Sequence, residues 1–193
     1  MLRRSIILVA VLILCLVATS WAKPRAGDYT KTIDIFKSVS GVAPFFDSAY
    51  GYAVFPSIGK GGLGIGAAHG KGQVYRGGKV TGDSSLTDVS IGLQAGGQAY
   101  RQVIFFQDER AYDEFTSGSY EFDAGAGAVA VTASADASAG TQGSGAGASP
   151  GGASGAAAGY EYHKGLLVFT ISTGGLMYEA TIAGQHYKFK PVE

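Results

Sequence analysis

The fold is decided by residues 49–78, which read AYGYAVFPSIGKGGLGIGAAHGKGQVYRGG. Alternating aromatic and aliphatic residues over 50–56 predict a β-strand that Pro56 closes. In the glycine-dense run 57–72, Leu63 and Ile65 alternate with glycine. That run predicts a strand whose other face carries no side chains, so another segment is expected to pack closely against its backbone. The pair Gly77-Gly78 then predicts a hairpin turn.

Short helices are expected before and after this stretch. A first helix is predicted from Asp28 or Thr30 to about Ser40, where apolar residues recur at three-residue spacing, namely Ile33, Phe36 and Val39. Pro44 is suited to open a second helical turn over 45–49. A third helix is predicted over 108–116, because Asp108 is a good N-cap and acidic residues fill the first turn.

Further strands are predicted over 86–100, 101–107, 119–123 and 128–132, and 101–107 is placed centrally because it is apolar on both faces. The C-terminal part is predicted to be a meander with turns at glycine, over 160–163, 166–172, 176–182 and 185–189. These elements predict a mostly β (α+β) protein: a curved antiparallel sheet or barrel-like β domain with one or two short helices.

The composition supports one folded domain. Hydrophobic residues make up 46% of the 193 residues and charged residues 16%, which is enough apolar material for a core. We expect a single domain over 23–193, interrupted at 136–158. That segment is almost wholly Ala, Gly and Ser, so it is predicted to be a flexible loop.

Residues 1–22 have the pattern of a secretory signal peptide. Arg3 and Arg4 precede an unbroken apolar run over 6–18, and small residues stand three and one positions before a cut at Ala22/Lys23. The run is short for a membrane span, although a retained anchor stays an alternative. We therefore expect an exported protein, periplasmic or extracellular, and peripheral on a membrane. The cut would also remove Cys15, the only cysteine.

The charge balance argues against a general nucleic-acid binder. Removing Arg3 and Arg4 with the leader leaves 13 basic against 15 acidic side chains, whereas such binders usually carry a basic excess.

No catalytic constellation is visible in the sequence, so we expect the protein not to be an enzyme. The glycines of 62–66 have neither dinucleotide nor phosphate-loop spacing, and no nucleophile elbow is present. Three histidines, His69, His163 and His186, are too dispersed to predict a metal site and are interpreted as hydrogen-bonded loop residues. The acids of 108–114 are interpreted as helix-start charges. No cofactor is expected.

The segment 49–78 resembles the signature of the SYLF lipid-binding family, also described as the actin-regulator family of yeast endocytosis. Weaker agreement continues at 90–98, 103–106, 174–180 and 184–185, so the resemblance covers roughly residues 33–191. It implies a protein that binds anionic membrane lipids, with bacterial relatives that are typically exported. The leader and the absence of an accompanying SH3 or FYVE module make actin an unlikely partner.

Basic residues near glycine-rich turns are the candidate lipid contacts. Lys60, Lys71, Arg76 and Lys79 have no acid among them in sequence, and each cation near an anionic surface contributes about 1 kcal/mol. Exposed N–H groups of such turns also bind phosphate. Lys31 and Lys37 lie on the first helix, whose apolar face is a second candidate membrane contact. The leading hypothesis is thus a non-catalytic module that binds anionic phospholipid head groups at the cell envelope.

Two alternatives remain open at this stage. The first is a structural or protein-interaction role in the envelope, without direct lipid binding and with an envelope protein as partner. The second is that the lysines only keep a β surface soluble. A deep pocket joining His69 or His163 to carboxylates would reopen the enzyme class.

Overall fold

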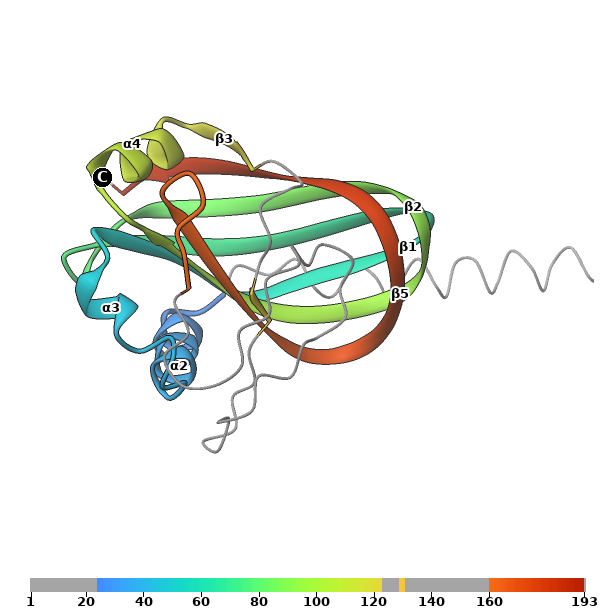
Figure 1. Ribbon diagram of the computed structural model, residues 1–193, viewed down its shortest axis with the longest axis horizontal. Coiled ribbons are helices and arrows are strands. Elements are labelled where there is room, and N and C mark those ends of the chain that lie inside the picture. The colour runs from blue at the N-terminus through green and yellow to red at the C-terminus, as the bar shows by residue number, and fades with distance from the viewer. Residues whose placement is uncertain (1–23, 123–128, 131–159, 193) are drawn as a thin grey trace, which may run out of the picture.

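The computed structural model describes residues 24–122, 129–130 and 160–192. Within them one curved sheet has five strands in the order β1-β2-β5-β3, with β4 also paired to β5 (Figure 1). All pairings are antiparallel except that of β4. The prediction of a mostly β, curved antiparallel domain is confirmed. The bounds are β1 Gly51–Arg76, β2 Lys79–Phe106, β3 Ser119–Phe122, β4 Val129–Ala130 and β5 Leu166–Pro191.

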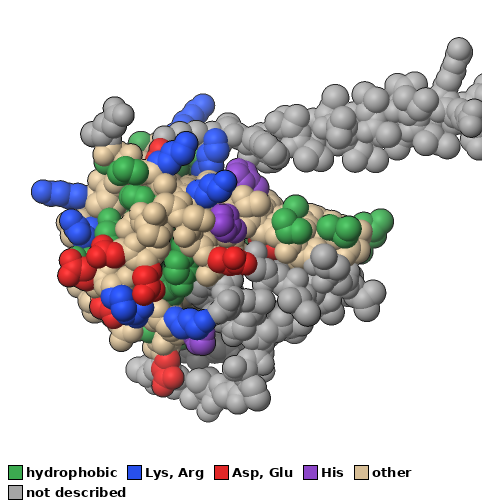
Figure 2. All heavy atoms as spheres, turned by 90° about the horizontal axis from the view of Figure 1, so that it is seen from above, with side chains coloured by type: hydrophobic (Ala, Val, Ile, Leu, Met, Phe, Trp, Pro, Cys, Tyr) green, Lys and Arg blue, Asp and Glu red, His purple; other side chains and the backbone are tan. Residues whose placement is uncertain are grey.

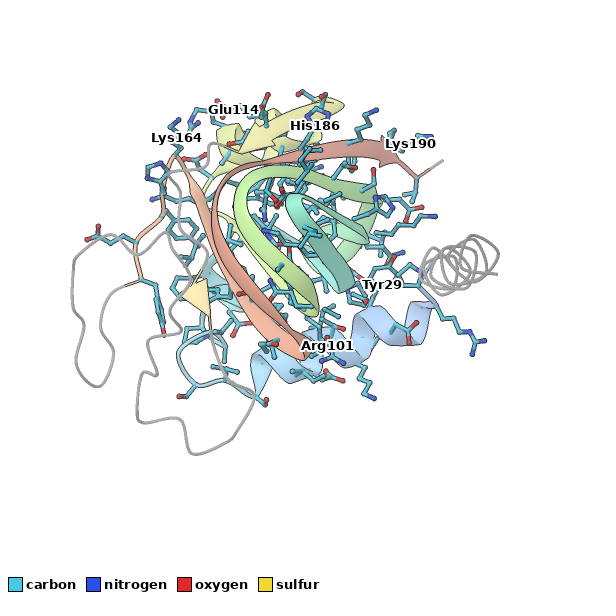
Figure 3. All side chains as sticks on the ribbon, turned by 90° about the vertical axis from the view of Figure 1, so that its right-hand side faces the viewer. Tyr29, Arg101, Glu114, Lys164, His186 and Lys190 are labelled. Carbon is cyan, nitrogen blue, oxygen red and sulfur yellow. The ribbon has the colours of Figure 1, made fainter. Side chains whose placement is uncertain are left out.

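Three very long strands bend back on themselves and give the sheet its shape. They form nested arcs, with β1 innermost, β2 next and β5 outside (Figure 3). The two halves of β1 lie against each other: a Cβ added at Gly72 would come within 2.7 Å of the Phe55 ring and 2.8 Å of the Val54 carbonyl oxygen. The predicted close approach to this glycine-rich backbone is therefore confirmed, and the packing segment is the start of the same strand.

The bend of β1 lies at 62–66 and depends on glycine. Gly64 has φ +74°, a left-handed conformation that side chains rarely adopt, and the β1–β2 register shifts between Leu63 and Ile65. A Cβ at Gly62 would collide with the Gly66 backbone. Pairing with β2 continues on both sides of this point, so the sheet is folded over rather than ended.

Two apolar cores lie on the two faces of the folded sheet. The inner core holds Phe55, Leu86, Phe106 and Tyr187 and is closed at one end by α4, Glu109–Thr116. The outer core holds Phe105 and other residues under α2, Ala26–Lys37, and α3, Phe45–Ser48. Helices α2 and α3 thus cover one part of the outer face of the sheet (Figure 1). No other described helix covers the rest of that face.

The three described helices match the predicted ones within a few residues. In α4 the Asp108 carboxylate accepts a hydrogen bond from the Ala111 N–H at 2.8 Å, and Gly118 follows with φ +115°. In α2 the Asp28 carboxylate accepts from the Arg25 N–H at 2.8 Å, so the helix begins before Asp28 rather than at it. Among the described helices, none has the length and apolar character needed to cross a membrane.

Several predictions about strands are corrected. Pro56 does not end the first strand, because β1 runs through it, and the strands predicted over 86–100 and 101–107 are parts of one strand, β2. The meander over 166–189 is wrong, because β5 is one strand that runs through its glycines, and it pairs with β2 almost without interruption. His69 and His186 are strand residues rather than loop residues. The leader, 1–22, and the predicted loop, 136–158, lie outside the described residues.

Candidate functional site

The four cations predicted to share one surface do not share it. Lys60 points into the folded sheet, where its Nζ lies 3.9 Å from Asp88 Oδ2, and the two side chains are only 9% and 3% exposed. The two residues come from opposite halves of the arc. Lys60 is therefore an internal ion-pair partner that ties the halves together, and it is removed from the candidate surface.

Arg76 and Lys79 lie at the hairpin that joins β1 to β2, far along the strands from the bend. The Arg76 guanidinium sits over the Tyr112 ring of α4, at 5.3 Å from its centroid. Lys71 is the one member of the predicted cluster that lies midway along the second half of β1, on the outer face. The sequence alone does not reveal this separation, because it does not show where β1 bends.

The predicted membrane-facing side of the first helix is also wrong. Phe36 is fully buried in the outer core, and Ile33 and Val39 pack beside it against the sheet. Lys37 covers the Phe46 ring at 5.3 Å. The apolar stripe of α2 therefore serves the core, and Lys31 and Lys37 lie on its exposed side.

The strand register instead brings a different set of basic residues together. Lys71 pairs with Ser85, and Ser85 pairs with Lys188, so the two lysines lie on one face, two strand spacings or roughly 10 Å apart. The next row toward the bend is His69, Thr87 and His186, and Lys190 lies two residues beyond Lys188. We call this set the basic ladder: Lys71, Lys188, Lys190, His69 and His186.

Two acidic residues lie next to the basic ladder and reduce its net positive charge. Asp83 pairs with Lys190 across the strands, and Glu121 of β3 pairs with His186. His186 Nε2 also lies 3.2 Å from the Ser119 hydroxyl. Within the described residues no ion pair involves any of the three lysines of the ladder; Lys188 and Lys190 are exposed, and Lys71 is half-buried.

The bend ends in an exposed apolar group. Leu63 is 83% exposed, Ile65 67% and Val89 59%, the three largest exposures among the large apolar side chains that the structure describes. The strand Ile65–Lys71 carries Ile65, Ala67, His69 and Lys71 on one face, and Val89 pairs with Ala67. We call Leu63, Ile65 and Val89 the apolar bend.

The apolar bend and the basic ladder form one graded surface. Apolar side chains gather at the projecting end of the molecule, histidines lie next, and lysines and arginines follow farther back (Figure 2). Ile65 and Lys71 are separated by six residues, or roughly 20 Å of strand. Isolated exposed apolar residues are ordinary on proteins, but a cluster of them at a projecting end of the molecule is a candidate interaction surface.

A buried polar network lies inside the folded sheet, and its chemistry is structural. The Gln102 amide donates to the Tyr187 hydroxyl at 3.0 Å, and that hydroxyl donates to Gln185 Oε1 at 2.6 Å. Burial raises the pKa of the Tyr187 phenol well above its usual value, so it remains a neutral donor. The network joins β2 to β5. Within the described ranges, no cluster of three or more His, Cys, Asp or Glu side chains is placed to hold a metal ion.

The β5 half of the basic ladder is not among the predicted site residues, although the sequence carries a signal for it. In 185–190, Tyr187 and Phe189 alternate with His186, Lys188 and Lys190. That period of two predicts a strand with one apolar face and one basic face. What the sequence does not show is that this basic face continues onto Lys71, because the pairing of β5 with β2 and of β2 with β1 is long-range.

Comparison with known proteins gives one informative similarity. The chain is 30% identical over 161 residues to Beta cell expansion factor A of Aeromonas veronii, and the alignment covers 82% of this chain and 52% of that protein. The chain thus spans about half the length of this curated relative. No protein-family model matches the chain, and no solved structure matches it. Over most of its own length, the chain is similar to Beta cell expansion factor A.

Proposed function

We propose that this protein is a non-catalytic module of the cell envelope that binds anionic phospholipid membranes through the apolar bend and the basic ladder. The observation that carries the proposal is that Ile65 of the apolar bend, and Val89 through its pairing with Ala67, lie on the same face as His69 and Lys71 of the ladder. Leu63 lies just across the Gly64 bend from them. The resemblance of 49–78 to the SYLF signature supports the same function, and the predicted leader supports an exported location. An envelope protein as partner is the alternative that the experiment below distinguishes.

The two features contribute to membrane binding in different ways: the apolar bend through burial of apolar surface, and the basic ladder through electrostatic attraction. Leu63, Ile65 and Val89 lose contact with water when they enter the interface, and apolar burial contributes about 25 cal/mol per Å². The three lysines of the ladder add roughly 1 kcal/mol each near an anionic surface. Because Lys188 and Lys190 are exposed, added salt weakens their attraction to the membrane, with a screening length of about 10 Å at 0.1 M. Binding is therefore expected to be both lipid-selective and salt-sensitive.

Co-sedimentation with vesicles tests the proposal. The protein is purified from expressing cells, its N-terminus is recorded by mass spectrometry, and it is mixed with phosphatidylcholine vesicles with or without phosphatidylglycerol. We expect binding only to the anionic vesicles. Replacing two ladder charges, Lys188→Gln with Lys190→Gln, should weaken it roughly thirty-fold, and Leu63→Ser with Ile65→Ser at least ten-fold.

The matched control removes two charges from the other end of the strands, Arg76→Gln with Lys79→Gln. This pair is expected to change binding less than three-fold. Equal binding to neutral and anionic vesicles would contradict the proposal, as would an equal loss in the ladder and control pairs. Crosslinking to a stoichiometric envelope protein without vesicle binding would favour the alternative.

A further inference from the structure

A hollow lies between the start of α2 and the sheet, apart from the basic ladder. Its volume is about 370 Å³, and it is lined by residues from the helix, from β1 at a register shift and from β2: Pro24, Arg25, Asp28, Lys31, Thr32, Pro56, Ser57 and Arg101. None of these residues belongs to the ladder. Arg101 lies beside α2, whereas His186 lies on the far side of the nested arcs (Figure 3). The hollow is therefore a separate site.

The lining is strongly basic for its size. Arg25, Lys31 and Arg101 come from different segments, and no described carboxylate forms an ion pair with Lys31 or Arg101 within the described part of the chain. The one acid of the lining, Asp28, already accepts the Arg25 backbone N–H at 2.8 Å. Guanidinium groups bind phosphate oxygens in pairs, and lysine adds a compact charge. The arrangement favours a small dianion.

We propose that this hollow binds a phosphate monoester of a small polyol. The class of ligand follows from the lining: the cations select phosphate, while the Ser57 hydroxyl and the Asp28 carboxylate offer partners to alcohol groups. The Thr32 hydroxyl already donates to the Asp28 backbone carbonyl at 2.8 Å, so it can only accept from the ligand. Among the described residues, no aromatic side chain lines the hollow, so these residues supply no stacking surface for a nucleobase. Its volume falls at the lower end of the range of small-ligand sites, about 300–1,000 Å³.

The same chemistry has two sources, a free solute or the head group of a lipid. Titration first tests whether the ester binds at all. Glycerol 3-phosphate is titrated into the purified protein by calorimetry, with inorganic phosphate and glycerol as partial ligands. We expect saturable binding of glycerol 3-phosphate, weaker binding of phosphate and no binding of glycerol. Arg101→Gln and Lys31→Gln should each weaken the ester at least ten-fold, while Lys188→Gln changes it less than two-fold.

A vesicle arm then identifies the source. If the ester competes with anionic vesicles and Arg101→Gln weakens both, the source is a lipid head group. If vesicle binding is unchanged by Arg101→Gln, the source is a free solute. Absence of saturable ester binding at 10 mM, or unchanged binding in Arg101→Gln and Lys31→Gln proteins that retain the wild-type circular dichroism spectrum, would overturn the inference. That result would leave the membrane proposal untouched, because the ladder and the bend are tested by other variants.

Discussion

At the residue scale, the internal pair of Lys60 and Asp88 shows why a charge in a glycine-rich run is hard to interpret from sequence. Lys60 stands in the glycine-dense run 57–72, which predicts a strand, and its neighbourhood makes it a candidate lipid contact. The bend of β1 instead turns it inward, where Asp88 neutralises it. A lysine in such a place stabilises the fold only while its partner is present, because an uncompensated buried charge is costly.

Lys60→Met is therefore expected to lower the free energy of unfolding by about 3 kcal/mol, since Asp88 then remains buried without this cation. Adding Asp88→Leu should recover more than half of the loss. Urea denaturation followed by circular dichroism measures both values, with exposed Lys79→Met as a control that should stay within about 0.5 kcal/mol. A change in Lys60→Met no larger than in the control would contradict the internal role.

The buried phenols of Tyr29 and Tyr75 predict how stability depends on pH. Burial raises the pKa of each to about 12, from 10. Their neutral forms are favoured in the folded protein, so this contribution is complete below pH 10 and disappears as the pH rises through 12. The free energy of unfolding should thus fall between pH 10 and 12. Ultraviolet titration that finds these tyrosines ionising near pH 10 in the folded state would contradict the assignment.

At the element scale, the sequence predicts local features well and long-range ones poorly. Helix α4 and the hairpin at Gly77-Gly78 are set by their own residues, and both are found where the sequence predicts them. The glycines of 173–175 and 183–184 were interpreted as turns, but they lie within β5. Glycine occurs both where a chain reverses direction in a turn and where a single strand bends. Which of the two occurs depends on whether the neighbouring strand continues to pair on both sides of the glycine. For β5 that neighbouring strand is β2, whose paired residue is 75 positions away at Gly174 and 95 positions away at Gly184.

The arc of β1 makes a direct prediction about its glycines. A Cβ at Gly70 would lie 2.5 Å from Ile58 Cγ1 and 3.1 Å from the Ser57 carbonyl oxygen, so Gly70→Ala forces the two halves of the strand apart. We expect a loss of about 1–3 kcal/mol in the free energy of unfolding. Gly59→Ala is the matched control, because nothing lies within 4 Å of its added Cβ. Similar melting temperatures for the two variants would argue against the folded-over strand.

At the scale of the whole molecule, the candidate surface arises from how the sheet is folded. Lys71, Lys188 and Lys190 are far apart in sequence and meet only because β2 lies between their strands. Of the six residues predicted to bind lipid, Lys71 belongs to this surface, Lys31 lines the separate hollow, and Lys60 is internal. The apolar bend was not predicted as a contact at all. In the sequence, Leu63 and Ile65 look like ordinary strand residues. They are exposed in the structure because they lie at the bend, where no described segment covers them.

The central claim is that the bend enters an anionic membrane, and a single fluorophore tests it most directly. The chain's one tryptophan, Trp21, lies in the predicted leader, so Leu63→Trp places a reporter on the bend and Val80→Trp one at the opposite hairpin. With phosphatidylglycerol vesicles, emission of Leu63→Trp should shift to the blue and be quenched by brominated acyl chains, while Val80→Trp stays unchanged. Unchanged emission at position 63, or equal shifts at both positions, would contradict the account.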